Sequence, residues 1–165
     1  MQKDFAKNLI KGKIGETIFD QMFREQGRFT VIPFGYDRMI PELAQHASKA
    51  ESQEVIDNIR SAPDFALVSQ DRKEVFLIEV KYRSKINIEE LKMVADKIQK
   101  RWKLVWMFVC TPQGFYFDKT DTITEKGEVT PLSKQWISGE LQEKYLKLIN
   151  EFKPKNKKND ESAGN

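Results

Sequence analysis

The stretch PDFALVSQDRKEVFLIEVK, residues 63–81, contains two apolar runs separated by a polar segment. Short runs rich in Phe, Val, Ile and Leu on either side of a turn predict a β-hairpin. We therefore expect strands over residues 64–69 and 74–82, joined by the turn at residues 70–73. Both strands carry ionisable side chains at the end away from the turn, where the apolar flanks predict burial.

The register of this hairpin predicts which of these side chains meet. With the turn centred between Asp71 and Arg72, Asp64 falls directly opposite Glu79. Such partners share a face of the sheet and have Cβ atoms about 5 Å apart. Because strand side chains alternate, Lys81 lies on the same face as Glu79. The hairpin is therefore expected to gather two carboxylates and one amine at its end.

Two ionised carboxylates at this place need a compensating charge. At a separation of about 4 Å they repel by roughly 4 kcal/mol at an effective dielectric of 20. Lys81 offsets part of this repulsion, and a divalent cation would offset it fully, with oxygen ligands favouring Mg²⁺ or Mn²⁺ over Zn²⁺. The alternative is an exposed cross-strand salt bridge, which the apolar residues 75–78 and Val80 make less expected.

A further carboxylate stands in the predicted first helix, residues 3–26. Apolar side chains at helical spacing form one broad arc of this helix, namely Phe5, Leu9, Ile18, Phe19, Met22 and Phe23. Glu16 lies near the edge of that arc, directly after Gly15 and four residues after Gly12. Each of these glycines lowers helix propensity by about 1 kcal/mol relative to alanine. Either Glu16 extends to solvent and the glycines ease helix packing, or Glu16 is a third carboxylate aimed at the metal.

The remaining pattern predicts an α/β fold with a mixed sheet flanked by helices. Further strands are expected at 28–34, with Pro33 typical of an edge strand, at 103–110, which is apolar throughout as in a strand covered on both faces, and at 115–117. Further helices are expected at 41–60, 88–101 and 140–152, with a turn-rich stretch before residue 139. These elements make one domain over residues 1–152, followed by a disordered basic and polar tail, 153–165.

The charge, the cysteine content and the length of the apolar runs limit which kinds of protein this chain can be. A chain of 165 residues with a net charge of +3 is only mildly basic, so binding of a polyanion would depend on local clusters of Lys and Arg. The single cysteine, Cys110, excludes an internal disulfide and is expected to be a buried apolar residue rather than a nucleophile. The longest apolar run is too short to span a membrane, so we expect a cytoplasmic protein with no membrane partner.

Together, Pro63-Asp64, fourteen intervening residues, Glu79-Val80-Lys81 and the preceding helical Glu16 resemble the PD-(D/E)XK nuclease superfamily. Within it, the small Holliday junction resolvases and restriction-endonuclease-like proteins are most similar in size and layout. The resemblance covers residues 5–117 and implies a restriction-endonuclease-like core, a four-stranded mixed sheet flanked by helices. The segment between Phe34 and Pro63 is longer than a minimal core and is expected to be an insert for substrate recognition or dimerisation.

The resemblance also implies roles for individual residues. Asp64, Glu79, the carbonyl of Val80 and Glu16 would hold Mg²⁺, for which Mn²⁺ would substitute, and the number of metals, one or two, stays open. Lys81 would orient or help to deprotonate the attacking water. The expected activity is hydrolysis of DNA phosphodiester bonds by an endonuclease of repair, recombination, restriction or mobile-element biology. RNA is the alternative substrate.

A basic cluster next to the motif is the predicted nucleic-acid surface. Residues 81–103 contain eight basic and three acidic side chains, a local charge of +5. The candidate contacts are Lys13, Arg83, Lys85, Lys92 and Gln99, of which Lys92 and Gln99 are expected to face the site from the helix 88–101. A chain this small also predicts a homodimer. Two rivals remain: a nuclease fold that binds nucleic acid or acts in assembly without cleaving it, and a regulatory protein unrelated to nucleic acid.

Overall fold

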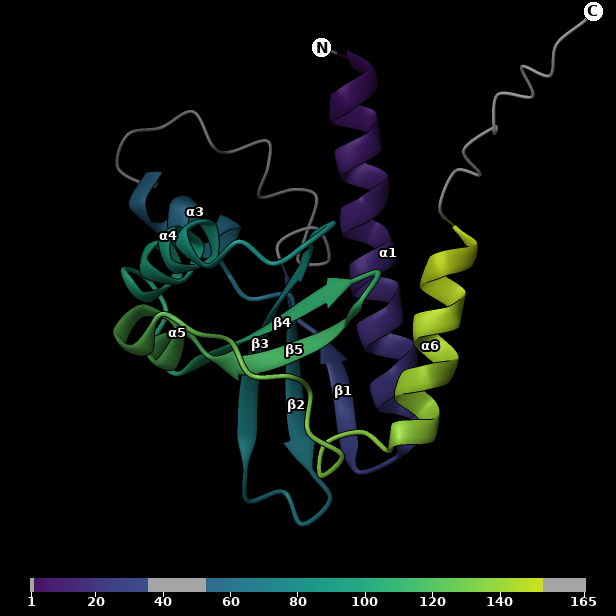
Figure 1. Ribbon diagram of the computed structural model, residues 1–165. Coiled ribbons are helices and arrows are strands. Elements are labelled where there is room, and N and C mark those ends of the chain that lie inside the picture. The colour runs from purple at the N-terminus through teal and green to yellow at the C-terminus, as the bar shows by residue number, and fades with distance from the viewer. Residues whose placement is uncertain (1, 36–52, 153–165) are drawn as a thin grey trace, which may run out of the picture.

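The computed structural model describes residues 2–35 and 53–152, and all structural statements concern these residues. Figure 1 shows the helices and strands in chain order. Their bounds are α1 Gln2–Gln26, β1 Phe29–Pro33, α3 Gln53–Arg60, β2 Phe65–Ser69, β3 Val75–Tyr82, α4 Ile88–Gln99, β4 Val105–Thr111, β5 Gly114–Lys119, α5 Thr120–Lys126 and α6 Gly139–Glu151. Every helix in this part of the chain is too short or too polar to cross a bilayer. The predicted tail, 153–165, lies outside it.

The five strands form one mixed sheet in the order β1-β2-β3-β4-β5. Neighbouring strands are antiparallel except β3 and β4, which run parallel and are connected through α4. The predicted mixed sheet flanked by helices is confirmed, and its five strands lie where the sequence pattern predicts strands, one more than the four-stranded core that the resemblance implies. Pro33 lies in the edge strand β1, where a residue without an amide hydrogen costs no ladder bond.

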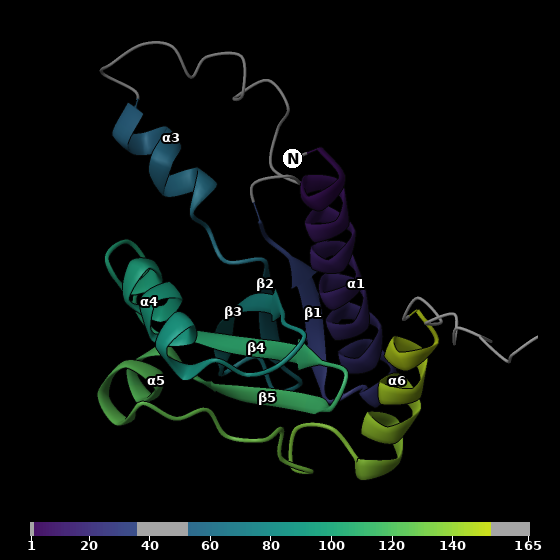
Figure 2. The same cartoon turned by 45° about the horizontal axis from the view of Figure 1, so that its top comes forward.

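Helices cover both faces of the sheet (Figure 2). On one face, Phe19 and Phe23 of α1 and Ile149 of α6 pack with Phe108 of β4 in the larger core cluster. On the other, a smaller cluster joins α4 and α5 to the sheet through Leu91, Ala95, Met107, Val109 and Ile123. Strand β4 is therefore covered on both faces, as its continuous apolar run predicts.

Cys110, at the end of this strand, is fully buried. Burial raises the pKa of its thiol to about 12, so the thiolate needed for nucleophilic attack is not formed near neutral pH. The prediction of a buried apolar cysteine is confirmed.

The predicted hairpin register is also confirmed. Phe65 pairs with Ile78 and Val68 with Val75, so the turn centre lies between Asp71 and Arg72. The strands are one residue shorter at their starts than predicted, and Asp64 immediately precedes β2.

The sequence prediction missed the helix α5 and part of β5. Residues 120–126, TDTITEK, are mostly polar and include only two buried side chains, Thr120 and Ile123, so no clear apolar period marks the helix. Its end is set by Gly127, whose φ of 64° lies in the left-handed region. Of the predicted helix 41–60, the structure has α3 at Gln53–Arg60, and residues 41–52 lie outside the described part.

The apolar arc of α1 is buried along only half of its length. Phe19, Met22 and Phe23 are fully buried, whereas Phe5 and Leu9 are 73% and 58% exposed. Figure 1 shows the reason: the N-terminal half of α1 extends beyond the sheet. Of the six side chains in the arc, Phe5 and Leu9 therefore lie outside the core.

The two glycines of α1 differ in what surrounds them. A Cβ atom on Gly15 would lie 3.4 Å from the Cβ of Tyr82 and 3.5 Å from Cγ1 of Val80, whereas a Cβ on Gly12 would meet nothing within 4 Å. Gly15 therefore faces β3 at van der Waals distance, where a Cβ would fit but a larger side chain would not, whereas Gly12 does not contact β3.

This difference predicts opposite effects of two substitutions. Gly15→Val should lower the free energy of unfolding by about 1–3 kcal/mol, because its methyl groups would push α1 away from β3. Gly12→Ala should raise it by up to about 1 kcal/mol, since alanine has the higher helix propensity. Denaturant unfolding measures both changes. A Gly15→Val protein as stable as Gly12→Ala would contradict the close crossing.

Candidate active site

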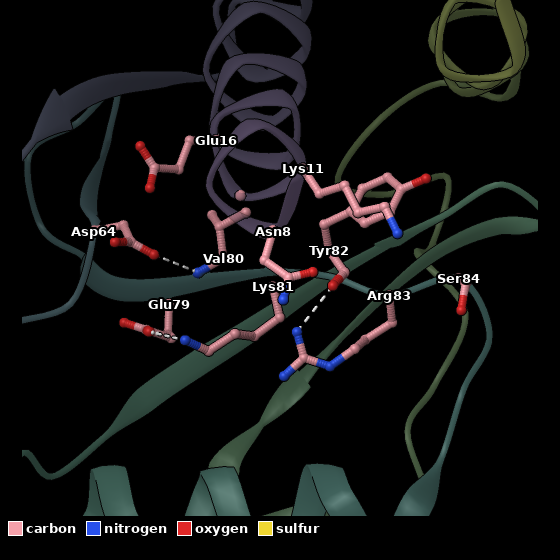
Figure 3. Close-up of a pocket in the computed structure, with 11 residues that line it drawn as sticks. Asn8, Lys11, Glu16, Asp64, Glu79, Val80, Lys81, Tyr82, Arg83 and Ser84 are labelled. Atoms are coloured by element: carbon pink, nitrogen blue, oxygen red, sulfur yellow. Dashed lines mark hydrogen bonds and ion pairs between the residues drawn. The ribbon is translucent and has the colours of Figure 1, made fainter. Parts of the chain in front are cut away.

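A cavity of about 550 Å³ lies between α1 and the end of β3 (Figure 3). Its walls come from the middle of α1, from the start of β2 and from β3 with the two residues after it. The lining residues are Asn8, Lys11, Gly12, Glu16, Asp64, Glu79, Val80, Lys81, Tyr82, Arg83 and Ser84. All four residues predicted to be catalytic, Glu16, Asp64, Glu79 and Lys81, therefore line one cavity.

Backbone amides of β3 and of the two residues after β1 hold Asp64 in place. Its carboxylate oxygen Oδ2 accepts a hydrogen bond of 2.8 Å from the amide of Val80. Its carbonyl oxygen accepts from the amides of Phe34 and Gly35, at 2.9 and 3.1 Å. A Cβ atom on Gly35 would lie 3.4 Å from the Cα of Asp64, so the chain after β1 passes directly beside it. Asp64 is thus fixed from both sides.

Glu79 and Lys81 form an ion pair within β3. The Nζ atom of Lys81 donates to Oε1 of Glu79 at 2.7 Å, and the two side chains are 28% and 14% exposed, respectively. Positions two apart on a strand share a face, which brings the ammonium beside the carboxylate. Lys81 therefore neutralises Glu79 more directly than it neutralises Asp64.

Glu16 reaches the same cavity from α1. Its side chain is 24% exposed and its Oε2 accepts from Nζ of Lys13 at 3.2 Å. The carboxylate of Glu16 thus lines the cavity and raises the pKa of Asp64, while its side chain stays partly exposed to solvent.

The electrostatics of the site concentrate on Asp64. Its pKa is raised to about 7, first because burial disfavours the charged carboxylate and then because Glu79 lies nearby. The amide of Val80 lowers this pKa, Glu16 raises it further, and Lys81 lowers it. The net result, mainly of burial and then of the neighbouring Glu79, is that Asp64 holds a proton up to about pH 7.

The donor chemistry at this place fits a hard divalent cation. Three carboxylates and a backbone segment with a carbonyl, at Val80, line one cavity, and oxygen donors are those that Mg²⁺ and Mn²⁺ prefer. The side chains are not gathered into a finished site, however. Within residues 2–35 and 53–152, no group of three acidic, histidine or cysteine side chains stands close enough to hold a metal. Two of the three carboxylates are ion-paired with lysines of the chain, Glu79 with Lys81 and Glu16 with Lys13.

The predicted nucleic-acid contacts fall into two groups. Arg83 lines the cavity, where its Nε donates to Glu90 at 2.9 Å and its Nη1 donates to the carbonyl of Tyr82 at 2.8 Å. Lys13 and Lys85 are exposed but do not line the cavity.

Lys92 and Gln99 do not face the site, contrary to the prediction. Lys92 lies beside Gly127, and the side chain of Gln99 donates to Asp121 and accepts from Thr124. Both residues pack toward α5, the helix that the sequence prediction missed. The sequence prediction did not include α5, so the side of α4 that carries Lys92 and Gln99 was expected to face the cavity.

Sequence reasoning missed three polar residues of the cavity, Asn8, Lys11 and Ser84. A signal for the first was present, because Asn8, Gly12 and Glu16 follow one another at four-residue spacing and so share a face of α1.

No protein-family model, curated protein or solved structure matches this chain. The site is therefore interpreted from its own geometry and chemistry.

The raised pKa of Asp64 predicts how stability depends on pH. Between about pH 4 and pH 7 the folded protein binds a proton at Asp64 that the unfolded chain has lost, so the stability from this group declines as pH rises from about 4 to about 7 and is constant above that. Asp64→Asn removes the charge and keeps an oxygen for the amide of Val80. In buffer with a chelator, this variant should be more stable than the wild type by about 2–4 kcal/mol at pH 8 and equally stable near pH 4.

Thermal unfolding at the two pH values measures this difference. The matched control is Asp71→Asn in the hairpin turn, where the hydroxyl of Ser69 and the amide of Lys73 lower the pKa of Asp71. This control should gain nothing at pH 8. A gain for Asp64→Asn that is equal at both pH values would contradict the proposed electrostatics.

Proposed function

We propose that this protein is a metal-dependent nuclease with a restriction-endonuclease-like fold, which hydrolyses phosphodiester bonds of DNA. The observation that carries the proposal is the repulsive pair Asp64 and Glu79, lodged with Lys81 in one solvent-accessible cavity. A buried carboxylate with a strongly raised pKa, beside other ionisable side chains in one cavity, is typical of a functional site. A phosphate with a divalent cation would complete the charge balance of this cavity.

Mg²⁺ is the proposed cofactor, and Mn²⁺ is expected to replace it. Asp64, Glu79 and the carbonyl of Val80 would hold it, with Glu16 as a further ligand. When bound, the cation would shield the charge of the scissile phosphate and supply hydroxide near neutral pH.

The chain's own residues have distinct tasks in this proposal. Asp64 must lose its proton for the cavity to receive a cation, so metal affinity should rise as pH increases through about 7. Lys81, held at 2.7 Å by Glu79, is placed to orient the attacking water and to stabilise the charge that develops on the phosphate. Arg83, fixed by Glu90 and the carbonyl of Tyr82, keeps a cation at the cavity wall.

DNA is the proposed substrate and RNA the alternative, in repair, recombination, restriction or mobile-element biology within the cytoplasm. We further propose a homodimer, because the described part of each chain brings Asp64, Glu79 and Lys81 together once. Two copies would be needed to cut both strands of a duplex.

A second candidate is a nuclease fold that binds nucleic acid or assists assembly without cleaving it. The observation that favours it is the lack, among the described residues, of three clustered side chains able to hold a metal. The two candidates differ in one measurable property. A nuclease binds Mn²⁺ at Asp64 and Glu79, whereas the binding module shows salt-sensitive DNA affinity with no Mn²⁺ uptake.

The activity test is the nicking of supercoiled plasmid in Mg²⁺ by wild type, Asp64→Ala and Lys81→Ala. Both variants should lose at least about 100-fold in rate, since each removes a charge used at the reacting phosphate. Lys126→Ala, which removes an exposed lysine of α5 away from the cavity, should nick like wild type. Equal rates in all four proteins would rule out the site assignment.

A further inference from the structure

The cavity has two chemically different sides (Figure 3). The carboxylates of Glu16, Asp64 and Glu79 lie on one side, and Lys11, Arg83 and Ser84 lie on the other. The proposed reaction uses the acidic side together with Lys81. The other side therefore needs a separate explanation.

Three cations line the cavity, and they differ in their partners. Lys81 is paired with Glu79 at 2.7 Å, and Arg83 donates to Glu90 at 2.9 Å. Lys11 is half-buried and forms no hydrogen bond or ion pair with the described residues. An ammonium at a cavity wall with no partner among the described residues is available to pair with an anion from outside the chain.

The neighbours of Lys11 supply neutral hydrogen-bond donors. The amide of Asn8 lies one turn earlier on α1, and the hydroxyl of Ser84 lies two residues after β3. In Figure 3 the side chain of Lys11 runs beside the ring of Tyr82, which bounds the cavity on that side. An ammonium with amide and hydroxyl donors is a typical combination for contacts to a nucleic-acid backbone.

We propose that Lys11, Asn8 and Ser84 form a second phosphate subsite, which holds the phosphodiester next to the scissile one along the same strand. This inference rests on the proposed nuclease function and names its substrate class. The substrate is a polynucleotide strand with a phosphate beyond the cleaved bond, not an isolated phosphodiester. A cavity of about 550 Å³ is of the size that holds small ligands, which is enough for the scissile phosphate and its neighbour on one strand.

The first test is binding of a labelled single-stranded oligodeoxynucleotide by fluorescence anisotropy over a range of NaCl concentrations, in the Asp64→Asn background to prevent cleavage. Lys11→Gln should weaken binding about 10-fold at low salt and reduce the slope of log K against log salt by about 0.7, the value for one lost phosphate contact. Lys11→Arg should restore both quantities. Lys126→Gln, the same charge change on α5, should alter neither.

The second test is a chemical double-mutant cycle. Oligonucleotides with one neutral methylphosphonate beside the cleaved bond should be cleaved more slowly than the unmodified strand by the wild type. Lys11→Gln should show no such difference, because the contact is already lost. With unmodified strands, Lys11→Gln should raise KM and leave kcat nearly unchanged. A single-stranded RNA of the same sequence, assayed in parallel, identifies which polymer gives the Lys11-dependent effect.

The outcomes separate the two proposals. If cleavage requires Asp64 but Lys11→Gln behaves like Lys126→Gln, the phosphate subsite is wrong and the nuclease function stands. If the wild type shows neither Asp64-dependent cleavage nor salt-sensitive binding of either polymer, both proposals are wrong.

Discussion

A hydrogen bond of 2.8 Å from the amide of Val80 to the carboxylate of Asp64 fixes the point at which the two hairpin strands bring their charges together. It depends on the antiparallel register that pairs Phe65 with Ile78. A slip of one residue would turn Asp64 to the opposite face of the sheet, because side chains alternate along a strand. The buried partners on the core side, above all Ile78 and Val80, oppose such a slip since it would expose them. The packing of the core therefore determines where the carboxylates meet.

The crossing of α1 over β3 adds the second half of the site. Gly15 allows the helix to approach Tyr82 and Val80 closely, and the same turn of helix carries Glu16 to the cavity. Burial then disfavours the charged form of Asp64, and repulsion from Glu79 and Glu16 adds to this effect. Asp64 therefore keeps its proton up to about pH 7. Asp64 thus destabilises the folded chain at neutral pH, and in the proposed function this cost is the condition for an oxygen-rich cavity that receives a cation. This exchange of stability for function is common at sites where a ligand completes the charge balance.

Much of this arrangement could be predicted from the sequence, because it depends on local rules. Strand alternation and the turn centre were sufficient to predict that Asp64, Glu79 and Lys81 lie together. Of the two glycines before Glu16, Gly15 is the one that lies where α1 crosses β3. The placement of Lys92 and Gln99 could not be predicted, since it depends on α5, a short polar helix with only two buried residues. Lys11 was missed for a different reason. Only the three-dimensional structure shows that Lys81 pairs with Glu79 and Arg83 with Glu90, while Lys11 has no partner among the described residues.

The central claim is that Asp64 and Glu79 are held together to share a divalent cation. A crystal structure of the protein with Mn²⁺, with the metal located by its anomalous scattering, tests this claim most directly. The account predicts a Mn²⁺ ion bound to both carboxylates, within the cavity that Glu16 and Val80 also line. A cavity without Mn²⁺ at saturating concentration, with Asp64 still bonded only to the amide of Val80, would contradict it.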